Sequence, residues 1–285
     1  GGELLKMKSY EVENKVGTVT ADLGWLYDES YADAQVKAFV WDMDKITPFV
    51  MPYESKANAA KIYMCGDSTM DSYGYTNKNA ADPEYARISG WGEEFGKYFD
   101  TNKAVVENYA LSGSSAREFY NYAALWKSVK PLLKKGDYVL IQFGHNDQGE
   151  ESSYDSAEES KKEYKYYLNL MAGEAAAAGA IPVFVTSINR LEYVNGVFTE
   201  TLGGYPEEMK KLAEDLKIPV IDIHAETAQW LTQIGENEAM QYFRYGRDGS
   251  DYTHLNTMGA RKIAAMVIDK IKSDSALAGL KALLK

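Results

Sequence analysis

Four polar segments of the chain carry the side chains that acyl transfer needs. They are residues 66–70, 108–115, 144–147 and 251–256. The hydroxyl of Ser68 is a poor nucleophile unless a general base lies beside it, and His254 suits that task because imidazole titrates near neutral pH. Asp251, three residues before His254, can hold the ring in one tautomer and stabilise its protonated form. The residue types and their spacing therefore predict a triad of Ser68, His254 and Asp251.

Attack of a serine on an ester produces an oxyanion, which needs hydrogen-bond donors that are already in place. The same segments supply three donors: the backbone N–H groups of Ser68 and Gly113 and the side-chain amide of Asn146. Gly113 has no Cβ, so its backbone can approach an oxyanion closely. Loss of one such donor typically costs about 3–4 kcal/mol of transition-state stabilisation. We expect these three residues to form an oxyanion hole.

Each of these candidates also has an ordinary structural use. Ser68 could cap a helix that follows it, and Asp251 and His254 could stabilise the start of the last helix. Asn146 and Gly113 are both common turn residues. The catalytic interpretation is favoured because the four segments together supply every group that one reaction requires.

Three further polar residues near these segments are expected to be structural. We expect Asp67 to hydrogen-bond the local backbone and fix the nucleophile loop. We expect His145 to support the loop of Asn146, and His224 to lie at the edge of the site without taking part in the reaction.

A metal site is not indicated. The sequence has three histidines and one cysteine, Cys65, without an HExxH motif or another close pair of metal ligands. Cys65 lies inside a predicted strand, where free cysteine behaves as a small hydrophobe. The predicted chemistry requires neither a metal nor a cofactor.

The pattern of strands and helices places the four polar segments at one edge of a sheet. Short apolar runs predict strands at residues 61–65, 104–109, 137–143, 181–186 and 218–222. Helical patterns occupy residues 91–99, 119–133, 158–178, 206–216 and 257–271. This alternation predicts an α/β fold, a doubly wound, five-stranded parallel sheet with helices on both faces. Ligands bind beyond the carboxyl ends of such strands, which is where the polar segments lie. Residues 189–204 are expected to form a loop or hairpin that turns at Gly196.

Residues 1–58 follow a different pattern from the rest. Residues 17–23 and 35–41 alternate apolar and polar side chains, as half-buried strands do. Pro48 and Pro52 break this pattern, and residues 54–58 have the composition of a linker. The segment is too small for a stable sandwich of its own. We expect the remnant of an upstream β module, or strands docked on a catalytic domain at residues 59–285.

Composition excludes several classes of partner. The chain has 285 residues with 31 basic and 42 acidic side chains, a net charge of −11. That charge disfavours nucleic acids and anionic membranes. No uncharged stretch is long enough to span a bilayer. The start, Gly1-Gly2-Glu3, lacks the pattern of a signal peptide and looks cut.

The four segments resemble, in order, the sequence blocks of the SGNH hydrolases, also called GDS-type esterases. The blocks are Gly-Asp-Ser-Thr at 66–69, Gly113, Gly-His-Asn-Asp at 144–147 and Asp-x-x-His at 251–254. Within that superfamily they look most like the rhamnogalacturonan acetylesterase branch of the carbohydrate esterases. The resemblance implies a flavodoxin-like SGNH fold, a Ser68–His254–Asp251 triad and oxyanion donors at Ser68, Gly113 and Asn146. Gln148 stands where relatives often have glycine, which bears on substrate preference.

We therefore expect a carboxylic ester hydrolase that removes acetyl groups from plant cell-wall polysaccharide, either pectin/rhamnogalacturonan or xylan, through an acyl-serine intermediate. The expected partner is an acetylated polysaccharide or oligosaccharide, and the β-rich start is compatible with further upstream domains. A substrate of this class implies a secreted or cell-surface protein. The 22 tyrosines, many in polar segments, favour contacts with sugars.

Two other functions remain open at this point. One is an SGNH lipase or thioesterase that acts on small-molecule esters, although an acidic protein without an apolar surface helix is poorly suited to a lipid interface. The other is a non-catalytic carbohydrate-binding protein, for which an intact serine, histidine and aspartate set would have no use.

Overall fold

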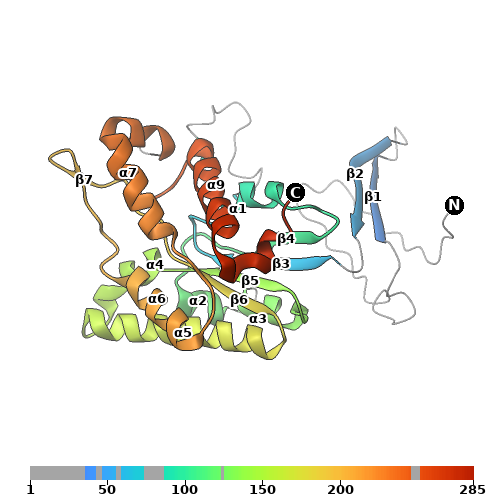
Figure 1. The fold of residues 1–285 in the computed structure, drawn as a ribbon, viewed down its shortest axis with the longest axis horizontal. Coiled ribbons are helices and arrows are strands. Elements are labelled where there is room, and N and C mark those ends of the chain that lie inside the picture. Colours follow the sequence, from blue (N-terminus) through green and yellow to red (C-terminus); the bar gives the residue numbers. More distant parts are fainter. Residues whose placement is uncertain (1–35, 43–46, 56–58, 74–86, 123–124, 245–250) are drawn as a thin grey trace. The chain divides into compact units, whose positions relative to one another are not determined.

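The structure is a computed structural model that describes residues 36–42, 47–55, 59–73, 87–122, 125–244 and 251–285 (Figure 1). The chain divides into two compact units, Gly1–Asn58 and Ala59–Lys285. In the first unit, β1 (Val36–Asp42) and β2 (Thr47–Ser55) form an antiparallel pair.

The first unit corrects part of the sequence interpretation. The strand expected at residues 35–41 is observed as β1, whereas the one expected at residues 17–23 lies outside the described residues. Pro48 and Pro52 do not interrupt the strand but lie inside β2, which also includes the first residues of the expected linker 54–58. In a two-stranded pair each strand has a free edge, and proline is tolerated there because it has no N–H to pair.

The second unit is built around a five-stranded parallel sheet, which confirms the predicted fold class. The strand order is β4-β3-β5-β6-β9. The strands are β3 (Ala60–Gly66), β4 (Ala104–Asn108), β5 (Tyr138–Gln142), β6 (Ile181–Val185) and β9 (Val220–Ile221). The chain passes from β3 to β4 at the edge and then crosses back to β5 on the other side of β3. The carboxyl end of β3 is therefore the switch point at which such sheets bind ligands.

Helices cover both faces of this sheet, as predicted (Figure 1). One face carries α1 (Gly92–Phe95), α7 (Ile223–Ala239) and α9 (Thr257–Ser273). The other carries α2 (Ala116–Asn121), α3 (Trp126–Val129), α5 (Ala157–Ala177) and α6 (Tyr205–Leu216). The short α4 (His145–Gly149) follows β5, and α10 (Ala278–Lys281) follows α9. Single 3-10 turns lie at Gly96–Tyr98, Lys130–Leu132, Glu151–Ser153, Met240–Tyr242 and Ser275–Leu277.

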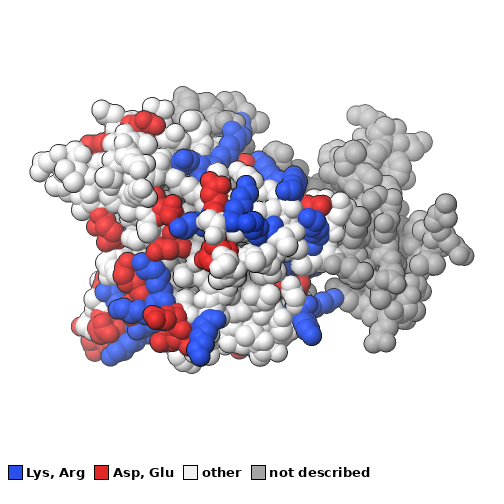
Figure 2. All heavy atoms as spheres, in the orientation of Figure 1, with Lys and Arg blue, Asp and Glu red and all other residues white. Residues whose placement is uncertain are grey.

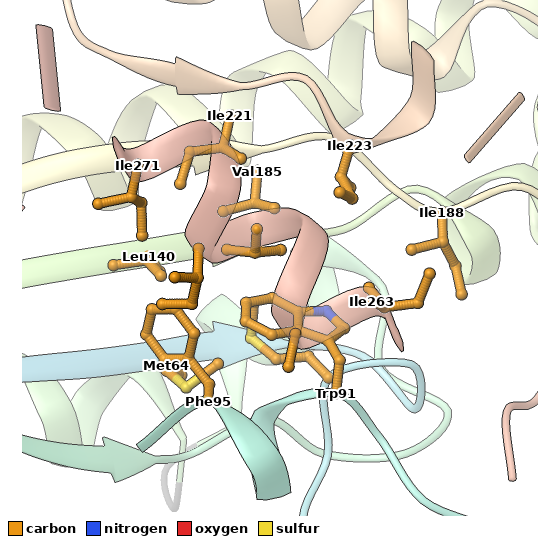
Figure 3. Close-up of a cluster of buried hydrophobic side chains, with 14 of the residues drawn as sticks. Met64, Trp91, Phe95, Leu140, Val185, Ile188, Ile221, Ile223, Ile263 and Ile271 are labelled. Atoms are coloured by element: carbon orange, nitrogen blue, oxygen red, sulfur yellow. The ribbon is translucent and has the colours of Figure 1, made fainter. Parts of the chain in front are cut away.

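Alternate residues of each central strand enter two separate cores. Ile62 and Met64 of β3 belong to the cluster beneath α1, α7 and α9, whereas Tyr63 and Cys65 belong to the cluster beneath α2, α3, α5 and α6. All four side chains are fully buried. Figure 3 shows the first cluster, which includes the strand residues Met64 and Val185 and Ile263 of α9. Burial on both faces explains why these strands are continuous apolar runs in the sequence.

The helices differ from the sequence prediction in two places. The helix expected at residues 119–133 is observed as α2 and α3, with a break between them. α2 begins earlier than expected because Ser115 and Glu118 form a capping box. α7 is absent from the prediction, although its buried residues Ile223, Thr227, Trp230 and Leu231 recur at helical spacing. Gly235 kinks this helix with a φ of 73° and weakens its sequence pattern.

Residues 189–204 contain the predicted hairpin. β7 (Tyr193–Val194) pairs antiparallel with β8 (Val197–Phe198). Asn195 and Gly196 form the turn and have φ values of 54° and 77°. Two successive positive φ values are typical of a type I′ turn, in which Asn-Gly is the preferred pair.

A chain restricted to residues 59–285 should fold as a unit by itself. Both described core clusters draw all their members from Ile62 onward, so removing the first unit takes no side chain from them. We expect far-UV circular dichroism typical of an α/β protein and one cooperative thermal transition, with the activity expected of Ser68 retained. A shortened chain without cooperative unfolding would show that residues 1–58 are needed to build the second unit.

Candidate active site

Ser68, His254 and Asp251 lie in contact at the carboxyl edge of the sheet. The Oγ of Ser68 is 3.0 Å from Nε2 of His254. The Nδ1 of His254 is 3.0 and 3.1 Å from Oδ2 and Oδ1 of Asp251. If Nδ1–H donates to the carboxylate, Nε2 is left to accept the serine hydroxyl. The structure therefore brings the three predicted triad residues together in the order that proton transfer requires.

A local turn holds Asp251 and His254 together. Oδ1 of Asp251 also accepts hydrogen bonds from the backbone N–H groups of Thr253 (3.2 Å) and His254 (3.0 Å). Burial raises the pKa of Asp251, but hydrogen bonds from the side chain and backbone of His254 outweigh it and hold that pKa below its usual value. The next turn of chain enters α9, which Asn256 caps by accepting from Gly259 N at 3.0 Å.

The Ser68 loop is fixed from below by Asp67, as expected. Oδ1 of Asp67 accepts from the backbone N–H and the hydroxyl of Thr69, at 2.9 and 2.8 Å. The hydroxyl of Tyr73 donates to the backbone oxygen of Ser68 at 3.0 Å. No helix begins at Thr69, so Ser68 does not act as the helix cap that the sequence left open.

A chain of buried hydrogen bonds runs beneath this loop. Trp91 Nε1 donates to Gln142 Oε1, and Gln142 Nε2 donates to the hydroxyl of Thr69, both at 2.7 Å. Oδ2 of Asp67 lies 3.3 Å from Nδ1 of His145. Burial raises the pKa of Asp67, but the hydrogen bond and charge of His145 bring it below its usual value. The sequence analysis missed Trp91 and Gln142. The sequence signal that could have identified Gln142 is a polar glutamine at the end of an otherwise apolar strand.

Hydrogen bonds connect the loops that carry the three predicted oxyanion donors. Asn146 Nδ2 donates to the backbone oxygen of Ser114, next to Gly113, at 3.0 Å. Leu111 N donates to Gly66 O at 2.9 Å and so ties this loop to the nucleophile loop. Within the described part of the chain, neither the N–H of Ser68 nor that of Gly113 has a hydrogen-bond acceptor. These N–H groups remain available to an oxyanion.

The backbone conformation of Gly113 gives a second reason for glycine at this position. Its φ is +83°, and a Cβ at this position would meet no atom within 4 Å. The left-handed backbone therefore favours glycine by itself, since the left-handed conformation costs other residues about 1–2 kcal/mol.

Asp147 links the two halves of the predicted oxyanion hole. Its Oδ1 accepts from Ala116 N at 2.9 Å and thereby joins α4, which carries Asn146, to the loop of Gly113. The side chain is buried, and its Oδ2 has no partner among the described residues. Burial raises the pKa of this carboxyl to about 8. The sequence analysis did not assign Asp147 any role.

The remaining histidine and the cysteine lie apart from the triad. Nδ1 of His224 is 3.2 Å from Ser187 O, and its Nε2 is 3.6 Å from Glu200. Burial in β3 raises the pKa of the Cys65 thiol well above its ordinary value. Among the residues the structure describes, no three His, Cys, Asp or Glu side chains are grouped so that they could hold a metal. No helix in that part of the chain has the length and apolar character needed to cross a membrane.

Replacing Asp147 with asparagine should change how stability depends on pH. The folded carboxyl has its pKa raised from 3.8 to about 8, so the folded state keeps a proton that the unfolded chain releases. The stability from this proton is complete below about pH 4 and is lost as the pH rises through about 8. An amide cannot ionise. Calorimetry should therefore find that the Tm of Asp147→Asn minus that of the wild type increases between about pH 4 and 9.

The exposed Asp155 provides a control for this measurement. Asp155→Asn makes the same substitution at an exposed position, and its Tm difference from the wild type should not rise in the same way. A Tm difference for Asp147→Asn that is independent of pH would contradict a protonated Asp147.

Relatives of the chain are known both as sequences and as structures. A protein named rhamnogalacturonan acetylesterase RhgT, from Bacillus subtilis, is 34% identical over 222 residues, which cover 74% of this chain and 89% of that protein. A rhamnogalacturonan acetylesterase from Emericella nidulans is 24% identical and covers 73% of this chain and 83% of the relative.

Solved structures share the fold. YxiM from Bacillus subtilis has a TM-score of 0.65 at 25% identity, and the match covers 82% of this chain and 64% of YxiM. Axe2, an acetylxylan esterase from Geobacillus stearothermophilus, has a TM-score of 0.51 at 16% identity over 76% of this chain and 97% of Axe2.

The family comparison confirms the resemblance predicted from the four sequence blocks. The model of the GDSL-like lipase/acylhydrolase family matches residues 62–267, which contain all the predicted site residues. This chain belongs to the GDSL-like lipase/acylhydrolase family.

Proposed function

We propose that this chain is a carbohydrate acetylesterase that removes acetyl groups from plant cell-wall polysaccharide with Ser68 as nucleophile. The observation that carries the proposal is the hydrogen-bonded series from Asp251 through His254 to Ser68. Family membership supports hydrolysis of an acyl ester. The names of the relatives from Bacillus subtilis and Emericella nidulans support an acetylated rhamnogalacturonan as substrate.

In the proposed first half-reaction, the acetyl group is transferred from the substrate to Ser68. Its Oγ bonds to the carbonyl carbon of the acetyl ester while its proton passes to Nε2 of His254. The carbonyl electron pair moves to oxygen, and this oxyanion accepts hydrogen bonds from Ser68 N–H, Gly113 N–H and the Asn146 amide. Asp251 keeps its negative charge and stabilises the imidazolium.

The tetrahedral intermediate formed by this attack then collapses and releases the sugar. The bond from carbon to the sugar oxygen breaks, and that oxygen takes the proton from His254, which leaves acetyl-Ser68. Water attacks this ester with His254 again as base, and collapse returns the proton to the Oγ of Ser68 and frees acetate. The scheme consumes only water, and no step in it uses a metal or cofactor.

The surroundings of the triad support a saccharide as substrate. Tyr252, between Asp251 and His254 in the chain, is 41% exposed, and an exposed tyrosine ring can stack on a pyranose face. Its backbone oxygen accepts from Leu191 N at 2.7 Å, which fixes the loop that presents the ring. A polymer of the plant cell wall lies outside the cell that attacks it, so we also propose that the protein acts when secreted or at the cell surface.

Substitution of the proposed triad should abolish turnover and leave the fold intact. Ser68→Ala and His254→Ala should each lower kcat/KM for p-nitrophenyl acetate by at least about a thousandfold, since an activated nucleophile and its base act as one unit. Asp251→Asn should cost less, because Asp251 orients the ring and does not bond to substrate.

Ser273→Ala removes an exposed hydroxyl at the end of α9 and is the matched control. It should keep wild-type activity, and circular dichroism should report an unchanged fold for all four variants. If Ser68→Ala retains more than about a tenth of wild-type kcat/KM, Ser68 is not the nucleophile.

The preferred acyl group should be small. A pocket that fits longer chains would gain about 0.8 kcal/mol for each buried methylene, so a lipase should prefer longer esters. For this protein we expect kcat/KM to fall from p-nitrophenyl acetate to butyrate to octanoate. Acetate should also be released from an acetylated pectin or xylan. A rising series without release from either polysaccharide would favour a lipase or thioesterase instead.

A further inference from the structure

Arg190 is a half-buried cation beside the candidate site. It follows β6 at the carboxyl edge of the sheet. Its Nη1 donates to Oε1 of Gln148 at 2.7 Å and to the hydroxyl and backbone oxygen of Thr201 at 3.2 and 3.4 Å. Its Nη2 makes one long contact, 3.5 Å, with the backbone oxygen of His145. All four acceptors are uncharged, so these contacts orient the guanidinium without neutralising it.

In the described part of the chain, no carboxylate forms an ion pair with the Arg190 guanidinium. The charge of Arg190 interacts at longer range with Asp67 and Glu200. By contrast, Arg117 and Lys270 have carboxylate partners, Glu150 and Glu226, at 3.0 and 2.7 Å. An arginine held in place yet left without a counter-ion is suited to an anionic ligand.

One edge of the Arg190 guanidinium is free to bind a ligand. Among the described residues, Nε of Arg190 has no hydrogen-bond acceptor. Nε of Arg244 also has none but is fully buried, whereas Nε of Arg190 is not. Nε–H and Nη2–H point the same way along one edge of the planar group. That edge binds a carboxylate through two parallel hydrogen bonds.

Arg190 lies next to both halves of the proposed catalytic machinery. The backbone oxygen that its Nη2 contacts belongs to His145, the residue directly before Asn146. The next residue in the chain, Leu191, donates its N–H to Tyr252 O within the Asp251–His254 turn. Arg190 is thereby linked to the segment that carries Asn146 and to the segment that carries His254.

We propose that Arg190 binds the carboxylate of a uronic acid residue in the substrate and so selects acetylated galacturonate-containing pectin over neutral xylan. The inference rests on the proposed acetylesterase function and adds a specificity determinant to it. Gln148 and Thr201 act as positioning residues that hold the guanidinium. The unusual Gln148 of the Gly-His-Asn-Asp segment then has a role in substrate choice.

The charge of the whole chain increases the value of a local cation for binding an anionic substrate. A net charge of −11 repels a polyuronate at long range. Over α5 and α6 the basic side chains lie among acidic ones, as Figure 2 shows. There Lys165 and Lys211 both pair with Glu208. A uronate near the triad therefore depends on a local cation that is not already paired.

The experiment compares acetate release from two forms of one substrate. The first is an acetylated oligogalacturonide with free carboxylates, and the second is the same oligosaccharide with its carboxylates converted to methyl esters. Wild-type kcat/KM should be about 10- to 100-fold higher for the free acid, the range expected of charge-assisted hydrogen bonds. Arg190→Gln should remove this preference mainly through KM. Its kcat/KM values for the free acid and for the methyl ester should then lie within about twofold of each other.

Two further variants isolate the guanidinium. Arg261→Gln removes the same charge from α9, where Arg261 lies near Glu94, and it should keep the wild-type preference. Arg190→Lys keeps the charge but loses the two-point geometry, so it should give an intermediate preference.

Binding provides a readout that needs no turnover. Ser68→Ala should bind a deacetylated oligogalacturonide in calorimetry, with an affinity that weakens as salt screens the charge pair. Adding Arg190→Gln to this variant should raise the Kd. The factor should equal the one by which Arg190→Gln reduces the kcat/KM ratio between the free acid and the methyl ester.

The outcomes separate this inference from the proposed function. Equal loss on the free acid and the methyl ester, or no wild-type preference between them, would overturn the role of Arg190 while the acetylesterase function stands. Hydrolysis of p-nitrophenyl acetate without acetate release from any acetylated oligosaccharide would overturn the proposed function, and the inference with it.

Discussion

The contact between Ser68 and His254 joins residues that are 186 positions apart in the chain. The 3.0 Å distance between Ser68 Oγ and His254 Nε2 depends on the packing of the second unit. Ser68 leaves the end of β3, a central strand, whereas His254 stands at the entrance to α9. Ile263 of α9 and Met64 of β3 belong to one buried cluster (Figure 3). Because hydrogen bonds weaken steeply with small changes in geometry, the packing of α9 on β3 determines whether the base can reach the nucleophile.

The nucleophile loop also depends on polar groups that the sheet takes out of water. Trp91, Gln142, Thr69 and Asp67 form an unbroken series of hydrogen bonds, and His145 lies at its end. A buried polar group is costly when unpaired, so a satisfied series permits few alternative arrangements. Among the described members of this series, the unpaired atom is Nε2 of His145. The loop is therefore supported by buried hydrogen bonds in addition to the apolar packing of Met70.

The sequence predicted the sheet and the members of the candidate site because both depend on local patterns. Five apolar runs identified the strands. The polar segments after two of them contained Ser68 and Asn146, and the segment before the last predicted helix contained His254. Asp147 was not identified, because its importance comes from complete burial against Ala116 N, a contact across 31 positions. α7 was missed because Gly235 interrupts its pattern. In both cases tertiary packing decides the outcome, and a single sequence does not reveal it.

The turn that joins Asp251 to His254 makes the acid and the base a single preassembled part. One carboxylate oxygen holds the backbone N–H of His254 and also lies beside its ring, so their mutual geometry is set within four residues. The rest of the fold has to align only one rigid piece with Ser68, rather than two independent side chains. A four-residue part of this kind could be moved as a whole to the loop before a helix in another sheet, and the design problem would reduce to docking that helix.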